Sequence, residues 1–544
     1  MSVKTSTDVG PTGSQVSGGL ANRLWPDGHP RRRQVLLVLC LSLLVVVIDN
    51  TVLNTALPTL ARVLPAGTSS LQWMVDAYTL CFAALLIPAG ALGDRYGRRL
   101  SLIGGLLLFA LGSLAASFAT SASVLVADRV VMGIGAAFVM PATLSILNAV
   151  FPPKERPQAI AAWSAVAGVG IVIGPTLGGF LLSHFFWGSV FLVNLPLVAV
   201  TLVGVLRIVP ETAEPGRRSF DVLGTLLVAA ALVAIVDAII EAPTRGWTGL
   251  ETLAEAAAGL VALAIFAWWE LRAEHPLIDL HVFSSRSFSA SSGAVTMTFF
   301  ALFGSLFVFT QYLQLVHGYS PLSAGIRALP FALSMGVISP LSPILAKRFG
   351  NRTVIPAGLA LMGLGLLDLS RVQVGTGYPA LALAVAIMGA GMGLVMAPAS
   401  TTIMTTVPSH QAGAGSAVND TIREVGGALG VAVVGSLTAA AYRTNLTTKL
   451  VAHHALGSVV QIATSSIAAA DAVGKRVGGV RGGEIVQTAH SSFTWAMALG
   501  MRVAGLVAVA AALGAVAAFP RSSQVRVAGL VPADAELVAT GSAA

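Results

Sequence analysis

Ten residues decide how this chain folds: Gly90-Ala91-Leu92-Gly93-Asp94-Arg95-Tyr96-Gly97-Arg98-Arg99. They lie between two long apolar runs, residues 72–92 and 100–119. Runs of about 20 apolar residues are long enough to cross a bilayer as helices, so the ten residues form a short basic turn at a membrane face. A weaker copy, Leu345-Ala346-Lys347-Arg348-Phe349-Gly350-Asn351-Arg352, places an arginine 253 positions (348 − 95) after Arg95. A membrane protein whose second half repeats its first is typically a transporter.

The composition agrees with a membrane protein. The 544 residues are 55% hydrophobic and only 10% charged, whereas soluble proteins carry about 25% charged residues. The net charge of +8 comes from basic residues clustered in short loops between apolar runs, which the positive-inside rule explains better than a nucleic-acid partner. Both cysteines, Cys40 and Cys81, lie inside apolar runs, so we expect core side chains rather than a disulfide or a metal site.

The apolar runs predict about fourteen transmembrane helices in an all-α integral membrane protein. The expected spans are 34–57, 72–92, 100–119, 124–147, 158–182, 189–209, 221–241, 253–272, 289–312, 322–345, 353–372, 378–402, 419–440 and 491–519. We interpret residues 1–33 as a polar tail, 34–209 as a six-helix bundle, 210–288 as two additional helices with their loops, 289–519 as a second six-helix bundle, and 520–544 as a second tail.

Lysine and arginine predict the orientation of these helices. They are abundant in alternate loops, including Arg31–Arg33 and Lys154–Arg156, and the intervening loops 120–123, 183–188 and 373–377 contain none. Both termini are therefore expected in the cytoplasm. The basic segment 441–490 falls on the other side, as long loops do regardless of charge, and its composition permits a small extracellular helical element.

A second internal repeat supports a duplicated architecture. The segment 132–141, MGIGAAFVMP, is similar to 388–398, MGAGMGLVMAP, and each lies in the corresponding helix of its half. The pattern is therefore six helices, two additional helices and six more.

Four segments together resemble the major facilitator superfamily, in particular its fourteen-span drug:proton antiporters of the QacA/EmrB-like type. Residues 90–99 match the family loop pattern G-x-L-x-D-R-x-G-R-[KR], and 49–58, DNTVLNTALP, resemble the first-helix motif of these antiporters. The fourth-helix pattern and the fifth-helix antiporter motif are matched by Leu125, Arg129, Gly133 and Gly135, and by Gly170, Gly174, Pro175, Gly178 and Gly179. Met132 stands where the family has glutamine, which removes one polar partner.

The resemblance implies a secondary active transporter in the plasma membrane, with two six-helix bundles that rock around a central cavity. It implies export of small amphipathic, often cationic drugs or antibiotics in exchange for protons, with the proton gradient as energy source and no cofactor. The fifth-helix motif marks exporters in the family. Protons and membrane lipids are the other expected partners, no nucleic acid is expected, and the chain is expected to function as a monomer.

Asp49 is the leading candidate for proton coupling. It lies 15 residues after Gln34 (49 − 34), about 22 Å into its span, where a bare charge is costly and is functional by default. Resemblance to the family makes Arg129 its natural partner, and Asp128 lies beside that arginine. The structural alternative is a hydrogen bond from Asp49 to Asn50 or Asn54, with Arg129 tethering helices.

Two backbone motifs have a functional and a structural interpretation. The loop at Gly90, Asp94, Arg95, Gly97, Arg98 and Arg99 is expected to be a latch between the bundles, or else a loop that only sets topology. Gly97 is expected at positive φ. Gly170, Gly174 and Gly178 recur every four residues and form a flat face for helix packing. Pro175 removes a backbone hydrogen bond and is expected to kink the helix; the structural alternative is generic packing of small residues.

Further polar side chains are candidates for the cavity or a gate. Asp76 and Tyr78 can line the cavity mouth or form an interfacial polar cluster; Gln311, Gln314 and Arg327 flank an expected outer turn; Asn50 and Asn54 follow Asp49. Glu424 is expected at an inner helix end, snorkelling towards water.

The missing motifs narrow the function. The sequence has no G-x-x-x-x-G-K-[ST] for nucleotide phosphates, no metal-ligand spacing and no G-x-S-x-G nucleophile, so we expect neither ATP-driven transport nor an enzyme. Two alternatives stay open: a dedicated exporter of one endogenous metabolite or lipid, and a non-transporting membrane sensor or scaffold.

Overall fold

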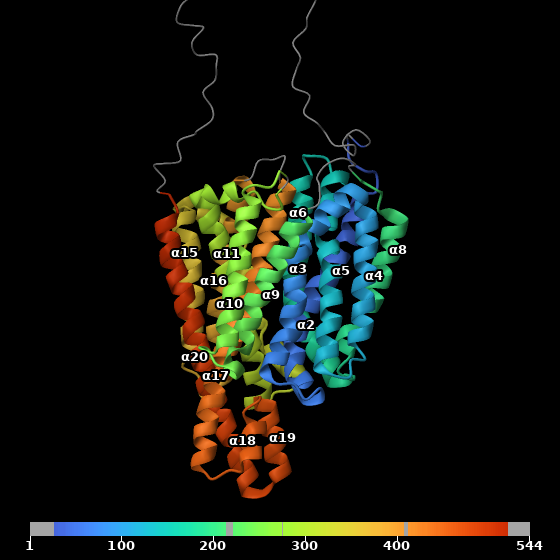
Figure 1. The fold of residues 1–544 in the computed structure, drawn as a ribbon. Helices are drawn as coiled ribbons and strands as arrows, with labels where there is room; N and C mark the ends of the chain where they lie inside the picture. Colours follow the sequence, from blue (N-terminus) through green and yellow to red (C-terminus); the bar gives the residue numbers. More distant parts are fainter. Residues whose placement is uncertain (1–24, 26, 214–220, 275, 407–411, 521–544) are drawn as a thin grey trace, which may run out of the picture.

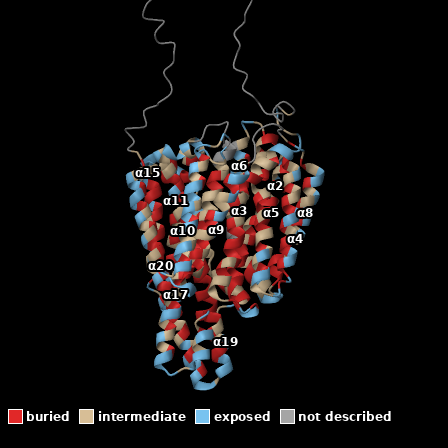
Figure 2. Ribbon diagram, viewed as in Figure 1, coloured by how far each residue is buried: buried red, intermediate tan, exposed pale blue. Residues whose placement is uncertain are grey.

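The computed structural model describes residue 25 and residues 27–213, 221–274, 276–406 and 412–520. These residues form fourteen helices that are long and apolar enough to span a membrane, as the sequence predicted, and no strand occurs among them. Figure 1 shows them as one upright bundle, with a smaller group of helices projecting from one end. Buried residues gather where helices face one another, while exposed residues follow the outer helices and the projection (Figure 2).

The first half contains seven helices, of which the short α7 and α8 together form one span. They are α2 (Arg32–Val63), α3 (Thr68–Tyr96), α4 (Arg98–Ala116), α5 (Ala122–Val150), α6 (Arg156–His184), α7 (Ser189–Leu192) and α8 (Asn194–Ile208). The principal packing pairs are α3 with α5, α4 with α5, and α2 with α6, and both α2 and α4 pack on α8.

The second half repeats these pairings. Its helices are α11 (Arg286–Gln311), the π-helical turn η2 (Tyr312–Val316), α12 (Pro321–Arg327), α13 (Leu329–Ile338), α14 (Ser342–Phe349), α15 (Asn351–Leu369), α16 (Tyr378–Thr406), α17 (Ala412–Ala452) and α20 (Gly479–Ala518). Here α13 packs on α16, α15 on α16, α11 on α17, and α15 on α20. The duplication seen in the sequence is therefore a duplication of helix packing.

Two additional helices, α9 (Val222–Arg245) and α10 (Leu250–Glu270), connect the halves, followed by the short η1 (Leu280–Ser284). Helix α9 packs on α3 of the first half and on α17 of the second, whereas α10 packs on α9. The apolar contact involves Leu232, Val236 and Ile240 of α9 with Leu80 and Ala428.

The expected span 322–345 is not one continuous helix. It breaks into α12, α13 and α14, each of which has a proline in its first turn. Proline lacks the backbone N–H that continues a helix and favours its first turn, so the breaks follow Pro321, Pro330 and Pro343. A hydropathy profile alone does not detect these breaks.

The segment 441–490, expected as a long loop whose composition permits a small helical element, is mostly helical. Helix α17 continues to Ala452, α20 begins at Gly479, and α18 (Gly457–Ala463) and α19 (Ile467–Val477) lie between them. Alanine favours a helix even where the sequence is no longer apolar enough to span a membrane. The expected spans are therefore shorter than helices α17 and α20. We call residues 441–490 the hairpin; it forms the projection at the bottom of Figure 1.

The two ends of the bundle can now be named. Helix α2 begins and α20 ends at the end opposite the hairpin (Figure 1). We call this end the terminal face, and the other the hairpin face.

Candidate functional site

A buried ion pair lies inside the first half. Arg129 Nη1 of α5 donates to Asp49 Oδ2 of α2 at 2.5 Å, and the two side chains are 0% and 2% exposed. Asn194 Nδ2 of α8 donates to the other carboxylate oxygen at 3.0 Å, and Arg129 Nε donates to the Met74 carbonyl of α3 at 3.0 Å. Four helices thus meet at one ion pair, and these hydrogen bonds offset the cost of burying both charges.

The aromatic and sulfur neighbours complete the surroundings of Arg129. Its guanidinium lies 4.1 Å from the ring centre of Tyr78, a cation–π contact, and Met132 Sδ lies 4.0 Å from Nη1. Met132 fills the place of the glutamine expected from the family pattern, and Nη2 has no hydrogen-bond partner. The site is therefore less fully hydrogen-bonded than the family pattern implied.

The structure corrects the expected place of Asp76 and Tyr78. Both are 0% exposed, so in this structure they line no cavity mouth and form no interfacial cluster. Neither carboxylate oxygen of Asp76 has a hydrogen-bond partner. One helical turn away, Gln72 Nε2 donates to the Val431 and Ala432 carbonyls of α17, each at 3.0 Å, so this face of α3 packs against the second half.

The other polar neighbours of Asp49 do not join the pair. Asn54 Nδ2 donates to the Asn50 carbonyl at 3.1 Å, so the predicted structural alternative, a bond from these residues to Asp49, is not the arrangement found. Asp128 Oδ2 has no hydrogen-bond partner, although Asp128 precedes Arg129 in the sequence. A role of Asp128 in proton coupling stays a prediction.

Sequence reasoning missed a second charged cluster, on α17. Arg423 Nη1 lies 3.3 Å from Asp420 Oδ1, and its Nη2 donates to Ser400 Oγ of α16 at 3.1 Å. Glu424 follows, and its Oε2 is buried without a partner. Glu424 also lies close enough to Tyr78 of the first half for the two to interact electrostatically.

Glu424 is not at a helix end, contrary to the expectation that it snorkels. Helix α17 begins at Ala412, twelve residues earlier (424 − 412), so Glu424 lies about 18 Å along the helix. The expected span began at 419, which placed both acids at its edge. Their separation of four residues, one helical turn, was the signal available in the sequence.

In the loop after α3, the hydrogen bonds described for Asp94 and Arg99 lie within the first half. Asp94 Oδ1 accepts from Arg98 Nε at 2.6 Å, and Gly97 has φ 131°, as predicted. The Glu211 carboxylate accepts hydrogen bonds from the backbone N–H groups of Arg99 and Leu100, at 3.2 and 3.4 Å. It therefore caps the N-terminus of α4 with a negative charge. The contacts described for this loop do not join the halves, so a latch between bundles stays a prediction.

The glycines of α6 serve two interfaces. A Cβ at Gly170, Gly174 or Gly178 would lie within 3.0 Å of a side-chain atom of α2, so this stripe packs flat on α2, as predicted. Gly179 faces the second half instead: a Cβ there would lie 2.5 Å from the Pro321 carbonyl oxygen. The motif therefore joins α6 to both halves.

The three candidates near the outer turn lie at the hairpin face. Gln314 Nε2 donates to the Thr55 carbonyl at 2.8 Å, which joins the halves. Gln311 donates to Phe307 of its own helix at 3.0 Å. The Arg327 guanidinium lies 3.9 Å from the ring centre of Tyr319, on which another ring stacks.

That other ring is His317, whose Nε2 lies 3.0 Å from the Tyr312 hydroxyl. Burial lowers the pKa of His317 below 6.5, and the positive charge of Arg327 lowers it further.

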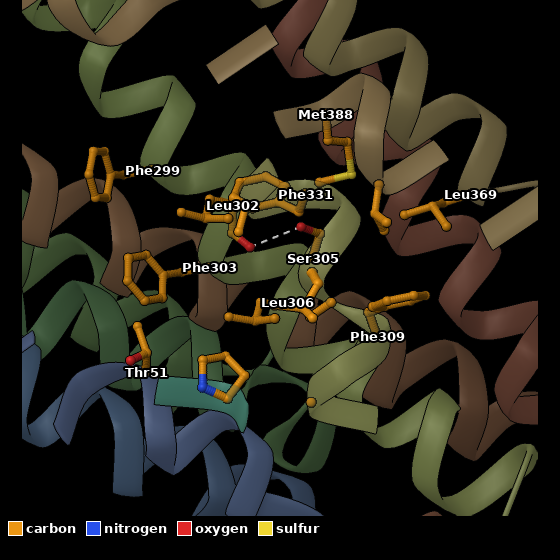
Figure 3. Close-up of a pocket in the computed structure, with 16 residues that line it drawn as sticks. Thr51, Phe299, Leu302, Phe303, Ser305, Leu306, Phe309, Phe331, Leu369 and Met388 are labelled. Carbon is orange, nitrogen blue, oxygen red and sulfur yellow. Dashed lines mark hydrogen bonds between the residues drawn. The ribbon is translucent and has the colours of Figure 1, made fainter. Parts of the chain in front are cut away.

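An apolar cavity lies between the halves (Figure 3). Sixteen residues line this cavity, which is partly open to the surroundings. Phe299, Phe303, Phe309 and Phe331 supply aromatic faces, and Thr51, two residues after Asp49, lies at the first-half side. The arrangement can hold an apolar or aromatic solute close to the helix that carries the buried carboxylate. Among the described residues, no group of three or more His, Cys, Asp or Glu side chains is placed to hold a metal ion.

Comparisons with known proteins agree with this architecture. The chain is 38% identical over 409 residues to the multidrug resistance protein Stp of Mycobacterium tuberculosis, covering 74% of each chain. It is 34% identical over 440 residues to the tetracenomycin C resistance and export protein of Streptomyces glaucescens, covering 81% of this chain and 80% of that protein. It is 35% identical over 422 residues to the methyl viologen resistance protein SmvA of Salmonella typhimurium, covering 76% and 84%.

The fold is found in solved structures as well. A bacterial homologue of the human lysosomal transporter Spinster, in an inward-facing and unoccupied conformation, aligns with a TM-score of 0.64 and 19% identity over 90% of this chain and 98% of that one. The family model of the Major Facilitator Superfamily, a family of transporters rather than enzymes, matches residues 39–431. The chain belongs to the major facilitator superfamily.

Proposed function

We propose that this chain is a secondary active transporter that exports small amphipathic compounds, drugs among them, in exchange for protons. The observation that carries the proposal is the buried Asp49–Arg129 pair in the middle of a membrane helix. The names of the relatives, which include multidrug resistance and export proteins, support the same function. The plasma membrane is the proposed location, with the terminal face in the cytoplasm, because the basic loops lie there.

The pair gives a physical basis for coupling. Protonation of Asp49 removes the negative charge and leaves Arg129 with only a carbonyl and an aromatic ring beside it. A buried cation that loses its anionic partner destabilises the protein by several kcal/mol. The two protonation states therefore favour different helix arrangements. Thr51 lies half a turn from Asp49 and lines the cavity, so a movement of α2 reaches the solute. The proton gradient supplies the energy, and no cofactor is required.

The contacts between the halves support a conformation open towards the terminal face. Gln314 joins the halves near the hairpin face, where Gly179 also packs on Pro321. Thr68 at the start of α3 bonds to the Ser465 carbonyl of the hairpin at 3.3 Å. With the terminal face in the cytoplasm, such a state takes up solute from inside, and rocking of the halves would release it outside.

The test is Asp49→Asn in reconstituted vesicles. We expect the rate of dye transport driven by an imposed pH gradient to fall at least about a hundredfold, because the asparagine amide cannot bind and release a proton as a carboxylate does. Solute exchange without a gradient should persist, because the cavity is unchanged. Asp368→Asn is the matched control, since it replaces an acid of a membrane-spanning helix of the other half, α15, in the same way. Full gradient-driven transport by Asp49→Asn would contradict the proposal.

Two measurements separate the alternatives. Export of several unrelated dyes by the wild type favours a multidrug exporter, whereas export of one compound favours a dedicated exporter. Solute-induced proton release from purified protein favours transport over a sensor or scaffold. We propose a monomer in contact with lipid as the functional unit, which mass measurement in nanodiscs can check.

A further inference from the structure

In the described part of the chain, both oxygens of the Asp49 carboxylate face hydrogen-bond donors. Arg129 donates to Oδ2, and Asn194 Nδ2 donates to Oδ1. This arrangement suits the charged form of Asp49. The protonated form has an O–H group that needs an acceptor, and a guanidinium offers only donors. The hydroxyl of Tyr78, the other ionisable neighbour, makes no hydrogen bond to a described residue. The proton therefore belongs on Oδ1, the oxygen that faces Asn194.

Asn194 lies at a break between two helices. Helices α7 and α8 are separate, and Pro196 follows two residues after Asn194. Proline has no N–H for the Leu192 carbonyl four residues earlier, which disfavours one continuous helix here. At this break Asn194 is 0% exposed and contacts two other helices at once. Its Nδ2 lies 3.0 Å from Asp49 Oδ1 of α2 and 3.0 Å from Ser113 Oγ of α4.

The partners of the Asn194 amide do not hold it in one orientation. Its nitrogen donates to two acceptors, whereas its oxygen is buried with no partner among the described residues. A half-turn about the Cβ–Cγ bond exchanges the nitrogen and the oxygen, which are nearly the same in shape. The present orientation already leaves one end of the amide unsatisfied. The half-turn therefore relocates an unsatisfied group instead of creating a new one.

The hydroxyl of Ser113 is able to follow such a turn. Ser113 is 0% exposed; its Oγ accepts from Asn194 and donates to the Phe191 carbonyl at 2.8 Å. A hydroxyl both donates and accepts, and its hydrogen rotates to suit its partners. An amide oxygen accepts two hydrogen bonds. After the turn, the Asn194 oxygen can thus accept one bond from Ser113 and one from protonated Asp49.

We propose that Asn194 binds Asp49 in both of its protonation states by turning its side-chain amide. The amide nitrogen donates to the carboxylate, and the amide oxygen accepts from the protonated acid. The inference rests on the proposed function, in which Asp49 takes up and releases the transported proton. The proton adds to Asp49 Oδ1 and leaves from the same atom, and no other covalent bond forms or breaks. Asn194 is a positioning residue: it stabilises both forms, so that neither form is trapped.

The first experiment removes the amide. Asn194→Leu keeps a side chain of similar size and removes both hydrogen-bonding atoms. Asn445→Leu is the matched control, since Asn445 of α17 also has a buried side-chain oxygen with no described partner and belongs to the hairpin. In proteoliposomes we expect Asn194→Leu to slow dye transport driven by a pH gradient by roughly tenfold or more, and Asn445→Leu to stay within about twofold of the wild type.

The dye concentration at half-maximal rate separates positioning from solute binding. Asn194 is not one of the sixteen described residues that line the cavity, so this concentration should stay the same in Asn194→Leu. Unchanged gradient-driven transport by Asn194→Leu, or an equal loss in both leucine variants, would overturn the role of Asn194. Full gradient-driven transport by Asp49→Asn would instead contradict the proposed function.

The second experiment observes the amide directly and needs no transport. Asparagine is isotope-labelled at its side-chain carbonyl, and infrared difference spectra are recorded as the pH of the purified protein is lowered until Asp49 is protonated. The Asn194 carbonyl accepts no hydrogen bond from a described residue, and a carbonyl that gains one absorbs at lower frequency. We therefore expect one labelled band to move to lower frequency as the acid band of Asp49 appears.

Two variants assign these bands. The acid band of Asp49 is the one missing from Asp49→Asn, and the moving labelled band should be missing from Asn194→Leu and present in Asn445→Leu. If the acid band of Asp49 appears while every labelled band stays in place, the amide does not turn and the proposal is wrong.

Discussion

The two halves share a fold and share the contacts of their basic loops, yet they hold charge differently. Arg95 and Arg348 each lie 5.3 Å from the following aromatic ring. Arg99 bonds to a carbonyl near the end of α8, and Arg352, 253 positions later (352 − 99), bonds to a carbonyl near the end of α20. The repeated residues thus make repeated contacts.

The buried charges do not repeat. In the first half, Asp49 of α2 has a side-chain partner on each oxygen, one from α5 and one from α8. In the second half, Asp420, Arg423 and Glu424 share one helix, and one carboxylate oxygen is buried without a partner. The first cluster is a product of tertiary packing, whereas the second is largely a local arrangement. The duplicated fold therefore does not duplicate its buried charges.

The largest effect is expected at the first cluster. Arg129→Ala leaves Asp49 as an unpaired buried charge, which should destabilise the protein by about 3–5 kcal/mol. The double variant Asp49→Asn, Arg129→Gln should recover most of this loss, because no charge is then left unpaired. Thermal unfolding of the purified protein measures both; equal stability of the single and double variants would show that the pair is not held as described.

The second half should respond in two different ways. Asp420→Asn removes the partner of Arg423 and should cost about 1–3 kcal/mol. Glu424→Gln removes a charge whose Oε2 has no partner and should leave stability unchanged or raise it slightly. The same unfolding measurement applies to both variants. A greater loss with Glu424→Gln would mean that this carboxylate has a structural partner and would remove the contrast between the clusters.

The repeated loops offer a matched pair of smaller effects. Gly97→Ala must adopt φ 131° and places its Cβ 2.8 Å from Glu211 Oε2, whereas Gly350→Ala must adopt φ 80° with no described atom within 4 Å. We expect about 1–2 kcal/mol from the backbone alone at Gly350 and a larger loss at Gly97. If the two variants lose the same stability in thermal unfolding, the contact with Glu211 contributes nothing to the difference, and the two loops are equivalent.

The smallest expected effect is a pH dependence at the hairpin face. Because the folded protein lowers the pKa of His317 below 6.5, the folded state binds fewer protons there than the unfolded state. Stability from this group is present above pH 6.5 and is lost as the pH falls through the lower folded value. His317→Gln should flatten part of the change in melting temperature between pH 7 and 5. An identical pH profile in the variant would exclude the histidine as its cause.

The sequence predicted the fold class, the number of spans and the two additional helices because hydropathy and loop charge report directly on a membrane environment. It also named Asp49 and Arg129. Prediction failed where the limits of a helix differ from the limits of the apolar run. Helices α17 and α20 continue past their apolar runs into the hairpin, and prolines divide the expected span 322–345 into three helices. Glu424 was misplaced for the same reason, because α17 begins earlier in the chain than the expected span.

Only the tertiary structure decided which groups meet. Asn194 and Met74 bind the ion pair from distant parts of the chain, and no spacing in the sequence relates them to Asp49. Only packing, likewise, places α9 against both α3 of the first half and α17 of the second. A sequence fixes which segments enter the membrane through the local cost of burying each residue, whereas partners inside the membrane depend on how helices far apart in the chain pack together.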